Sequence, residues 1–155
     1  MIAVVGPGTD VDAEVLAMAE KVGRLVAEAG HQIVTGGLGG VMAAAAHGAR
    51  AAGGTAVALL PGDDPSAANA DSDVVIATGL GQGRNVLVVR SAAAVIAVGG
   101  SWGTLSEVAI AMRAGKPVVW VMGWDVAGIP TAPTAEEAVA TTLTKLSAGP
   151  DPGGS

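Results

Sequence analysis

Short runs of apolar residues recur along the chain, and each is followed within two residues by Gly or Pro and then by a stretch of helical character. The apolar positions in these runs are continuous rather than alternating, which is typical of strands buried on both faces of a sheet. The runs predict six strands: Ile2–Val5, Gln32–Thr35, Thr55–Leu60, Asp73–Ala77, Ala93–Val98 and Pro117–Met122. We therefore expect both faces of the sheet to be covered.

Helical segments separate these strands. Four are predicted at Val11–Ala29, Gly40–Ala52, Gly103–Ala114 and Thr134–Leu146. The Val-rich stretch Arg84–Ser91 is compatible with a strand, but the alternation of elements and the preceding glycines favour a short helix. Alternating strands and helices predict an α/β fold of three layers, with a doubly wound, mostly parallel, Rossmann-like sheet. Residues 1–147 form one predicted domain, and the Gly- and Pro-rich residues 148–155 a predicted disordered tail.

Composition narrows the classes of partner. The formal net charge is −6, and the eight Lys and Arg residues are spread along the chain, so a nucleic-acid partner is not expected. The lack of cysteine excludes disulfides and thiolate catalysis, and with only two histidines we expect no metal site. No apolar run has membrane-spanning length and the start lacks a basic segment, so we expect a cytoplasmic protein without membrane contact. High hydropathy with few charges favours a homodimer or higher homo-oligomer.

The first candidate site is the glycine-rich stretch Thr35–Gly40, which joins the second predicted strand to a helix. Glycines at such a junction let the backbone and the helix N-terminus approach a phosphate closely. The alternative is a tight turn whose glycines only allow close packing. The stretch lacks the Lys-Ser/Thr ending of a P-loop and the GxGxxG spacing of dinucleotide-binding folds, which disfavours ATP hydrolysis and hydride transfer.

The second candidate site is Gly99–Glu107, again between a buried strand and a helix. Thr104 and Glu107 fit a Ser/Thr-x-x-Glu capping box, which is a purely structural role. Glu107 is also the acid expected in the crevice, where it could bond ribose hydroxyls or stabilise an oxocarbenium ion. Trp102 could stack on a base, although tryptophan is more often found in a core or an interface.

Arg84 and Asn85 follow a third glycine-rich turn at the start of the short predicted helix. The planar guanidinium of Arg84 suits a phosphate or a paired carboxylate, and the alternative is an exposed helix arginine. Asn85 could cap that helix or bond a ligand.

These motifs, taken in order and spacing, resemble the LONELY GUY-like Rossmann proteins. That superfamily includes nucleoside 5′-monophosphate phosphoribohydrolases, proteins labelled lysine decarboxylases, and molybdenum cofactor carriers. The resemblance covers nearly the whole chain and implies that Arg84 and Glu107 are the catalytic pair. It further implies a ligand- and phosphate-binding set made of Gly36, Gly37, Gly39, Gly40, Asn85, Gly100, Ser101, Gly103 and Thr104.

The chain departs from the phosphoribohydrolase pattern in two places. It has Gln82-Gly83-Arg84-Asn85 where those enzymes have His-Glu-Arg-Lys, and Gly99-Gly100-Ser101 where they have Pro-Gly-Gly. It therefore looks more like the uncharacterised, carrier-like branch. The lysines lie at predicted helix positions or ends away from the crevice, which gives a decarboxylase no support.

Two functions follow as expectations. The chain binds a nucleoside monophosphate or similar phosphorylated ligand and hydrolyses its N-glycosidic bond, with no cofactor required. Alternatively, it is a non-catalytic carrier or sensor of a phosphorylated cofactor, such as the pterin of the molybdenum cofactor. A structural subunit without a ligand is the third option.

Overall fold

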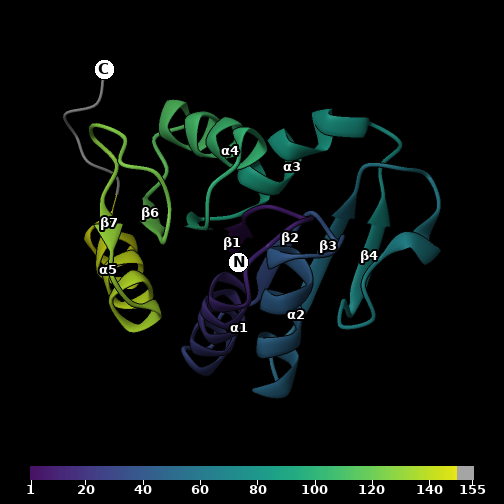
Figure 1. The fold of residues 1–155 in the computed structure, drawn as a ribbon, viewed down its shortest axis with the longest axis horizontal. Coiled ribbons are helices and arrows are strands. Elements are labelled where there is room, and N and C mark those ends of the chain that lie inside the picture. The colour runs from purple at the N-terminus through teal and green to yellow at the C-terminus, as the bar shows by residue number, and fades with distance from the viewer. Residues whose placement is uncertain (150–155) are drawn as a thin grey trace.

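The computed structural model describes residues 1–149, which form a parallel sheet flanked by helices on both faces (Figure 1). The strands are β1 (Ile2–Val5), β2 (Ile33–Thr35), β3 (Ala56–Leu60), β4 (Val74–Ala77), β5 (Ala94–Val98), β6 (Val118–Val121) and β7 (Thr131–Ala132). The α-helices are α1 (Ala13–Glu28), α2 (Val41–Ala51), α3 (Arg84–Ser91), α4 (Trp102–Arg113) and α5 (Ala135–Ala148). Short 3-10 helices occur at η1 (Pro65–Ala67) and η2 (Gly81–Gly83). The predicted α/β, doubly wound architecture is confirmed.

The predicted elements are all present, including the short helix Arg84–Ser91, which has the predicted bounds. Sequence patterns missed β7, because a strand of two residues, one of them exposed, carries no apolar run. Helix α5 continues two residues past its predicted end, to Ala148. Most of the predicted tail, residues 150–155, lies outside the residues that the structure describes.

The strand order is β4-β3-β2-β1-β5-β6-β7, and neighbouring strands are parallel throughout. The chain builds outward from β1 to β4, then returns to the other side of β1 and builds outward again from β5. The order of winding thus reverses between β1 and β5. In open α/β sheets, ligands bind at the carboxyl ends of the strands beside such a reversal.

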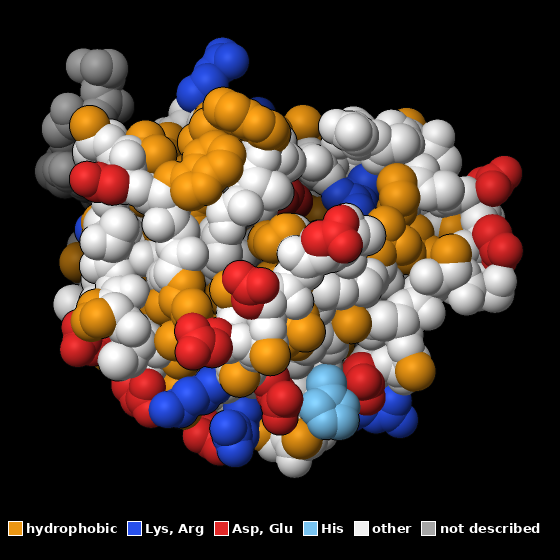
Figure 2. Space-filling view, viewed as in Figure 1, with side chains coloured by type: hydrophobic (Ala, Val, Ile, Leu, Met, Phe, Trp, Pro, Cys, Tyr) orange, Lys and Arg blue, Asp and Glu red, His pale blue; other side chains and the backbone are white. Residues whose placement is uncertain are grey.

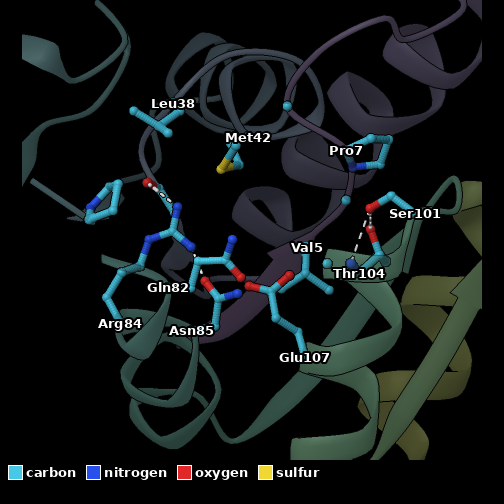
Figure 3. A pocket seen from close by; sticks show the side chains of 15 residues that line it. Val5, Pro7, Leu38, Met42, Gln82, Arg84, Asn85, Ser101, Thr104 and Glu107 are labelled. Atoms are coloured by element: carbon cyan, nitrogen blue, oxygen red, sulfur yellow. Dashed lines mark hydrogen bonds between the residues drawn. The ribbon is translucent and has the colours of Figure 1, made fainter. Parts of the chain in front are cut away.

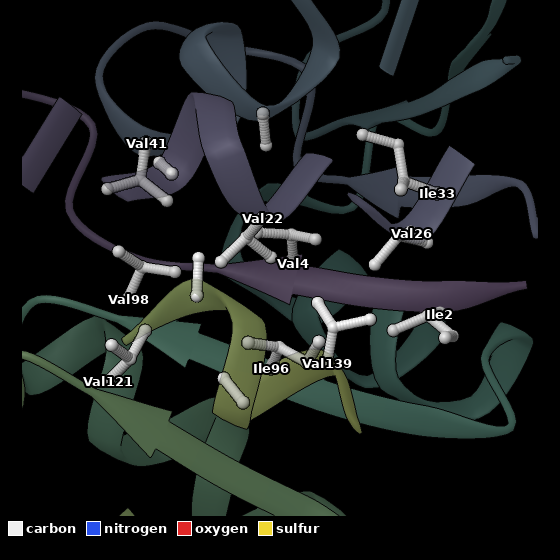
Figure 4. Close-up of a cluster of buried hydrophobic side chains, with 14 of the residues drawn as sticks. Ile2, Val4, Val22, Val26, Ile33, Val41, Ile96, Val98, Val121 and Val139 are labelled. Carbon is white, nitrogen blue, oxygen red and sulfur yellow. The ribbon is translucent and has the colours of Figure 1, made fainter. Parts of the chain in front are cut away.

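Two apolar clusters hold the layers together. On one face, side chains of β1, β2 and β5 pack against α1, α2 and α5 (Figure 4). On the other face, α3 and α4 cover a second cluster that contains the fully buried Trp120. Most members are Val, Ile and Ala, whose small or branched side chains allow helices to lie close to the sheet. None of the helices within residues 1–149 combines the length and the apolarity needed to cross a membrane.

The edge strand β4 departs from the predicted burial of every strand on both faces. Val74 and Ile76 are 45% and 48% exposed. They pair with Val57 and Leu59 of β3, which belong to the face covered by α3 and α4. Helix α3 has only eight residues and packs on β1, β2 and β3, so it ends short of the edge (Figure 1). The sequence pattern was therefore wrong about one face of β4.

Candidate functional site

A cavity of about 290 Å³ opens at the carboxyl ends of the central strands, where Figure 2 shows a hollow with recessed acidic and basic side chains. The starts of α2, α3 and α4 surround it. Seven of the eleven predicted site residues line it: Gly36, Arg84, Asn85, Ser101, Gly103, Thr104 and Glu107. Gly37, Gly39, Gly40 and Gly100 are not part of the lining. The fold thus brings the three candidate segments together at one place.

Gly36 makes room for Arg84. The Nη2 atom of Arg84 donates a hydrogen bond of 3.2 Å to the carbonyl oxygen of Gly36, so the guanidinium reaches across from α3 to the end of β2. A Cβ atom at position 36 would lie 2.5 Å from that nitrogen. A residue with a side chain would therefore displace the arginine, and glycine is needed here for the site rather than only for the turn.

Gly37 and Gly40 have a backbone reason of their own. Both adopt positive φ, of 78° and 60°. A Cβ atom at Gly37 would press on the side chains of Ala58 and Leu60, and one at Gly40 would overlap the carbonyl oxygen of Pro7. For these two glycines, a tight turn with close packing explains why glycine is present, and this is the alternative that the sequence left open.

Asn69, in the loop between β3 and β4, holds the glycine-rich turn from outside. Its side-chain amide donates to the carbonyl oxygen of Leu38 at 3.0 Å, and its backbone N–H donates to that of Gly37 at 2.9 Å. Sequence analysis missed this residue, because an asparagine more than thirty positions away carries no local signal for the contact. Asn69 therefore holds the turn through two hydrogen bonds.

The helix N-termini at the cavity differ in capping. Helix α2 begins after Gly40 with no side-chain cap. Helix α4 begins at Trp102, and its N-cap Ser101 accepts a hydrogen bond of 3.1 Å from the N–H of Thr104. The predicted capping box was wrong, because the helix starts earlier than expected and Ser101 takes the capping role. Glu107 is thereby free of a capping role.

Arg84 is a buried cation, only 8% exposed. Besides Gly36, it donates through Nη1 to the side-chain oxygen of Asn85. Its Nε atom is buried and has no hydrogen-bond partner among residues 1–149. Burial lowers the pKa of Arg84, and the nearby charge of Glu107 partly offsets that effect. A buried donor without a partner is costly, so this site is suited to receive an acceptor from a ligand.

Glu107 faces Arg84 from α4 and is 7% exposed. Burial raises the pKa of its carboxyl group to about 7, and the charge of Arg84 reduces that rise. In Figure 3 the side-chain amides of Gln82 and Asn85 lie between the two charged groups. The site therefore holds an arginine and a carboxyl group that can gain or lose a proton near neutral pH.

Several lining residues were missed by the sequence analysis. The loop after β1 contributes Gly6, Pro7 and Gly8, and the turns after β2 and β3 contribute Leu38 and Pro61. Gly6 directly follows the first buried strand, and a Cβ atom there would overlap the carbonyl oxygen of Val98. A glycine directly after a buried strand is the sequence signal that indicates this loop.

Among the described residues, this cavity is lined by no lysine and by no group of side chains that could hold a metal ion. Within residues 1–149, no group of three or more His, Cys, Asp or Glu side chains is placed to hold a metal ion. Lys116 donates to backbone carbonyls at the end of α3, and Lys21 forms an ion pair with Glu136. Neither lysine lines the cavity.

The model of the SLOG cluster4 family matches residues 1–147. The chain belongs to this family. An uncharacterised protein of Archaeoglobus fulgidus is 49% identical to this SLOG protein over 117 residues, which are 76% of each chain. The expected membership in the carrier-like branch of the LONELY GUY-like Rossmann proteins is confirmed.

Two solved structures are close to that of this SLOG protein. The molybdenum cofactor binding protein of Rippkaea orientalis is 34% identical, with a TM-score of 0.88 over 92% of this chain and 94% of that one. The molybdenum cofactor carrier protein of Chlamydomonas reinhardtii is also 34% identical, with a TM-score of 0.85 over 94% and 97%. The shared fold thus extends over nearly the full length of each protein.

The protonation of Glu107 predicts a pH dependence of stability. Its native-state pKa of about 7 lies above the ordinary value of 4.5, so the native protein binds the additional proton between these values. The free energy of unfolding should therefore fall as the pH rises through this window, by an amount on the order of 3 kcal/mol. We expect Glu107→Gln to remove this fall and to be more stable than the wild type above pH 7.

Chemical denaturation at pH 5 and pH 8 measures the effect. Glu137→Gln, on the exposed side of α5, is the matched control and should retain the wild-type pH dependence. Parallel stability curves for Glu107→Gln and the wild type would contradict the prediction.

Proposed function

We propose that this SLOG protein is a carrier that binds a phosphorylated pterin of the molybdenum cofactor type. The observation that carries the proposal is the close likeness, over nearly the whole chain, to a molybdenum cofactor binding protein and a molybdenum cofactor carrier protein. The departures from the phosphoribohydrolase motifs at Gln82–Asn85 and Gly99–Ser101 support the same choice.

The polar groups of the cavity favour a phosphate. The start of α2 has no side-chain cap, and its first N–H, that of Val41, donates to the carbonyl oxygen of Pro7 at 3.0 Å. It presents the positive end of a helix of eleven residues, and Met42 of its first turn lines the cavity. Arg84 lines the same cavity, and its Nε atom has no hydrogen-bond partner among residues 1–149. A phosphate oxygen at this position would accept a charge-assisted hydrogen bond from a group that otherwise stays buried and unsatisfied.

The size of the cavity suits a carrier. A volume of about 290 Å³ lies at the lower end of the range for sites that enclose a small molecule, about 300–1,000 Å³. Part of a phosphorylated pterin would therefore remain outside the cavity. An exposed part is accessible to an acceptor protein, as a carrier requires.

Cargo retention tests the proposal. We expect the protein purified from bacteria that make molybdenum cofactor to contain molybdenum, measured by plasma mass spectrometry, and a pterin, measured by fluorescence after oxidation. Arg84→Ala should lower both at least tenfold, because it removes the buried cation. Arg90→Ala, at the exposed end of the same helix, is the matched control and should retain cargo.

Thermal melts verify that Arg84→Ala remains folded. A wild-type protein that contains neither molybdenum nor pterin, and that binds neither when mixed with released cofactor, would overturn the proposed carrier function.

A second candidate function is hydrolysis of the N-glycosidic bond of a nucleoside monophosphate, and Glu107 is the observation that favours it. With a pKa of about 7, its carboxylate can accept a proton from water near neutral pH. Water would add to the anomeric carbon of the ribose while the C–N bond breaks and its electron pair leaves with the base. Arg84 would hold the phosphate or orient the carboxylate.

Incubation with AMP tests this function. If the protein is a hydrolase, chromatography detects free adenine and ribose 5-phosphate, and Glu107→Gln lowers their rate of formation at least a hundredfold. Equal, background rates for both proteins exclude the reaction and leave the carrier function unaffected.

We also propose that a second copy of the chain covers the exposed face beside β4. This face consists of Val74, Ile76, Leu80, Val86 and Leu87, which are 38–57% exposed and uncharged. Strands of parallel sheets are ordinarily covered on both faces, and α3 ends short of β4. A two-fold contact would place the same apolar side chains of both copies opposite one another without burying a charge.

Light scattering after size exclusion measures the oligomer. We expect a dimer or a higher oligomer for the wild type and a shift to the monomer for Ile76→Asp, because the contact would bury an unpaired carboxylate. Met112→Asp, equally exposed but on α4, should leave the mass unchanged. A wild-type monomer at 100 µM would contradict the proposal.

A further inference from the structure

The three tryptophans of the chain form a continuous series from the core to the surface. Trp120 in β6 is fully buried. Trp124 packs on it with ring centroids 6.2 Å apart, and Trp102 lies edge-on to Trp124 at 5.0 Å with an interplanar angle of 74°. Trp102 is 80% exposed, more than any other large hydrophobic side chain that the structure describes. Most of its indole is therefore available for contact.

Glycines make room for this series. A Cβ atom at Gly100 would lie 2.5 Å from the Nε1 atom of Trp124, and one at Gly123 would overlap the indole of Trp120. Trp120 also donates from Nε1 to the carbonyl oxygen of Gly99. Gly100 was expected to bind phosphate, and in the structure it lies outside the cavity and accommodates an aromatic ring instead. The support under Trp102 is thus fixed by the backbone.

Trp102 lies in the chain between two lining residues, and its own side chain is not part of the lining. It is the first residue of α4, and Ser101 before it and Gly103 after it both line the cavity. In Figure 3, Ser101 and Thr104 lie at one side of the cavity and Arg84 at the other. Hydrophobic side chains also gather over α4 next to the hollow in Figure 2.

The two sides of the cavity differ in what they can bind. The side of Arg84 combines a buried guanidinium, whose Nε atom has no partner among residues 1–149, with the N-terminus of α2, which has no side-chain cap. At the other side, the hydroxyl of Ser101 already satisfies the N–H of Thr104 in the first turn of α4. An anion gains most at the first side. The second side offers an exposed indole, and one first-turn N–H of α4, that of Thr104, is already bonded there.

We propose that Trp102 is a stacking platform for the planar ring of the ligand, whose phosphate binds at the side of Arg84. The inference rests on the proposed binding of a phosphorylated ligand and adds its chemical class: a monophosphate that carries a flat heterocycle, such as a pterin or a purine. Indole faces stack on any such heterocycle, and a ring held in place loses little conformational entropy on binding. A sugar phosphate without a ring would gain nothing from Trp102.

Calorimetry with three probes tests the inference: a pterin monophosphate, AMP and ribose 5-phosphate. We expect Trp102→Ala to weaken the binding of one or both ring-bearing probes at least tenfold and to leave the affinity for ribose 5-phosphate within twofold of the wild type. Trp102→Phe should restore most of the lost affinity. Met112→Ala, which removes another exposed apolar side chain of α4, is the matched control and should bind all three probes as the wild type does.

Each outcome separates the inference from the proposed function. Wild-type affinity of Trp102→Ala for both ring-bearing probes overturns the stacking role and leaves phosphate binding intact. A change of oligomeric mass in Trp102→Ala with unchanged affinities shows that Trp102 is an interface residue and also overturns it. If none of the probes binds the wild type at millimolar concentration, both the inference and the phosphate site are wrong.

Discussion

The contact between Arg84 and the backbone of Gly36 is the constraint around which the site is built. It requires a glycine at the end of β2, because a side chain there would occupy the place of the guanidinium. It also buries a cation at the reversal point of the sheet, opposite the buried Glu107. Neither charge is neutralised by a close ion pair within the described residues, and both pKa values shift against the charged form. Burying two charged groups without a close ion pair lowers the stability of the fold. Binding of an anion would be a physical reason for these buried charges.

The same pair of charged groups is compatible with carrying a ligand and with cleaving one. A carrier needs the arginine and the helix N-terminus to hold a phosphate, and it needs part of the ligand to stay accessible. A hydrolase needs in addition a carboxylate that accepts a proton from water. The cavity is small, which leaves part of a ligand accessible and favours carrying, while the pKa of Glu107, about 7, is compatible with accepting a proton from water. Measuring cargo and cleavage separately is therefore more informative than either assay alone.

The helix N-termini on the two sides of the cavity differ in whether a side chain caps them. Two helices of similar orientation meet there, and both were expected to bind phosphate on the basis of their glycines. Ser101 bonds the N–H of Thr104 in the first turn of α4, whereas the starts of α2 and α3 have no side-chain cap. The capped start of α4 is the one that carries the exposed aromatic ring of Trp102.

The sequence by itself determined the α/β architecture and the segments that form the site. Continuous apolar runs and periodic helices gave the strands and helices, since burial on both sides of a parallel sheet leaves a direct record in the sequence. The glycines after β2 and β5 and the pair Arg84 and Glu107 were also identifiable, because strand ends in such a sheet meet at one edge.

Only the tertiary structure decided how those residues divide their roles. Gly36 admits the arginine, Gly37 and Gly40 serve the turn, and Gly100 accommodates Trp124, although all four look alike in the sequence. One face of β4 is exposed because α3 ends before it reaches that strand. Asn69 bonds the glycine-rich turn because the loop between β3 and β4 returns to it. These are contacts between segments remote in the chain, and local patterns of polarity do not encode them.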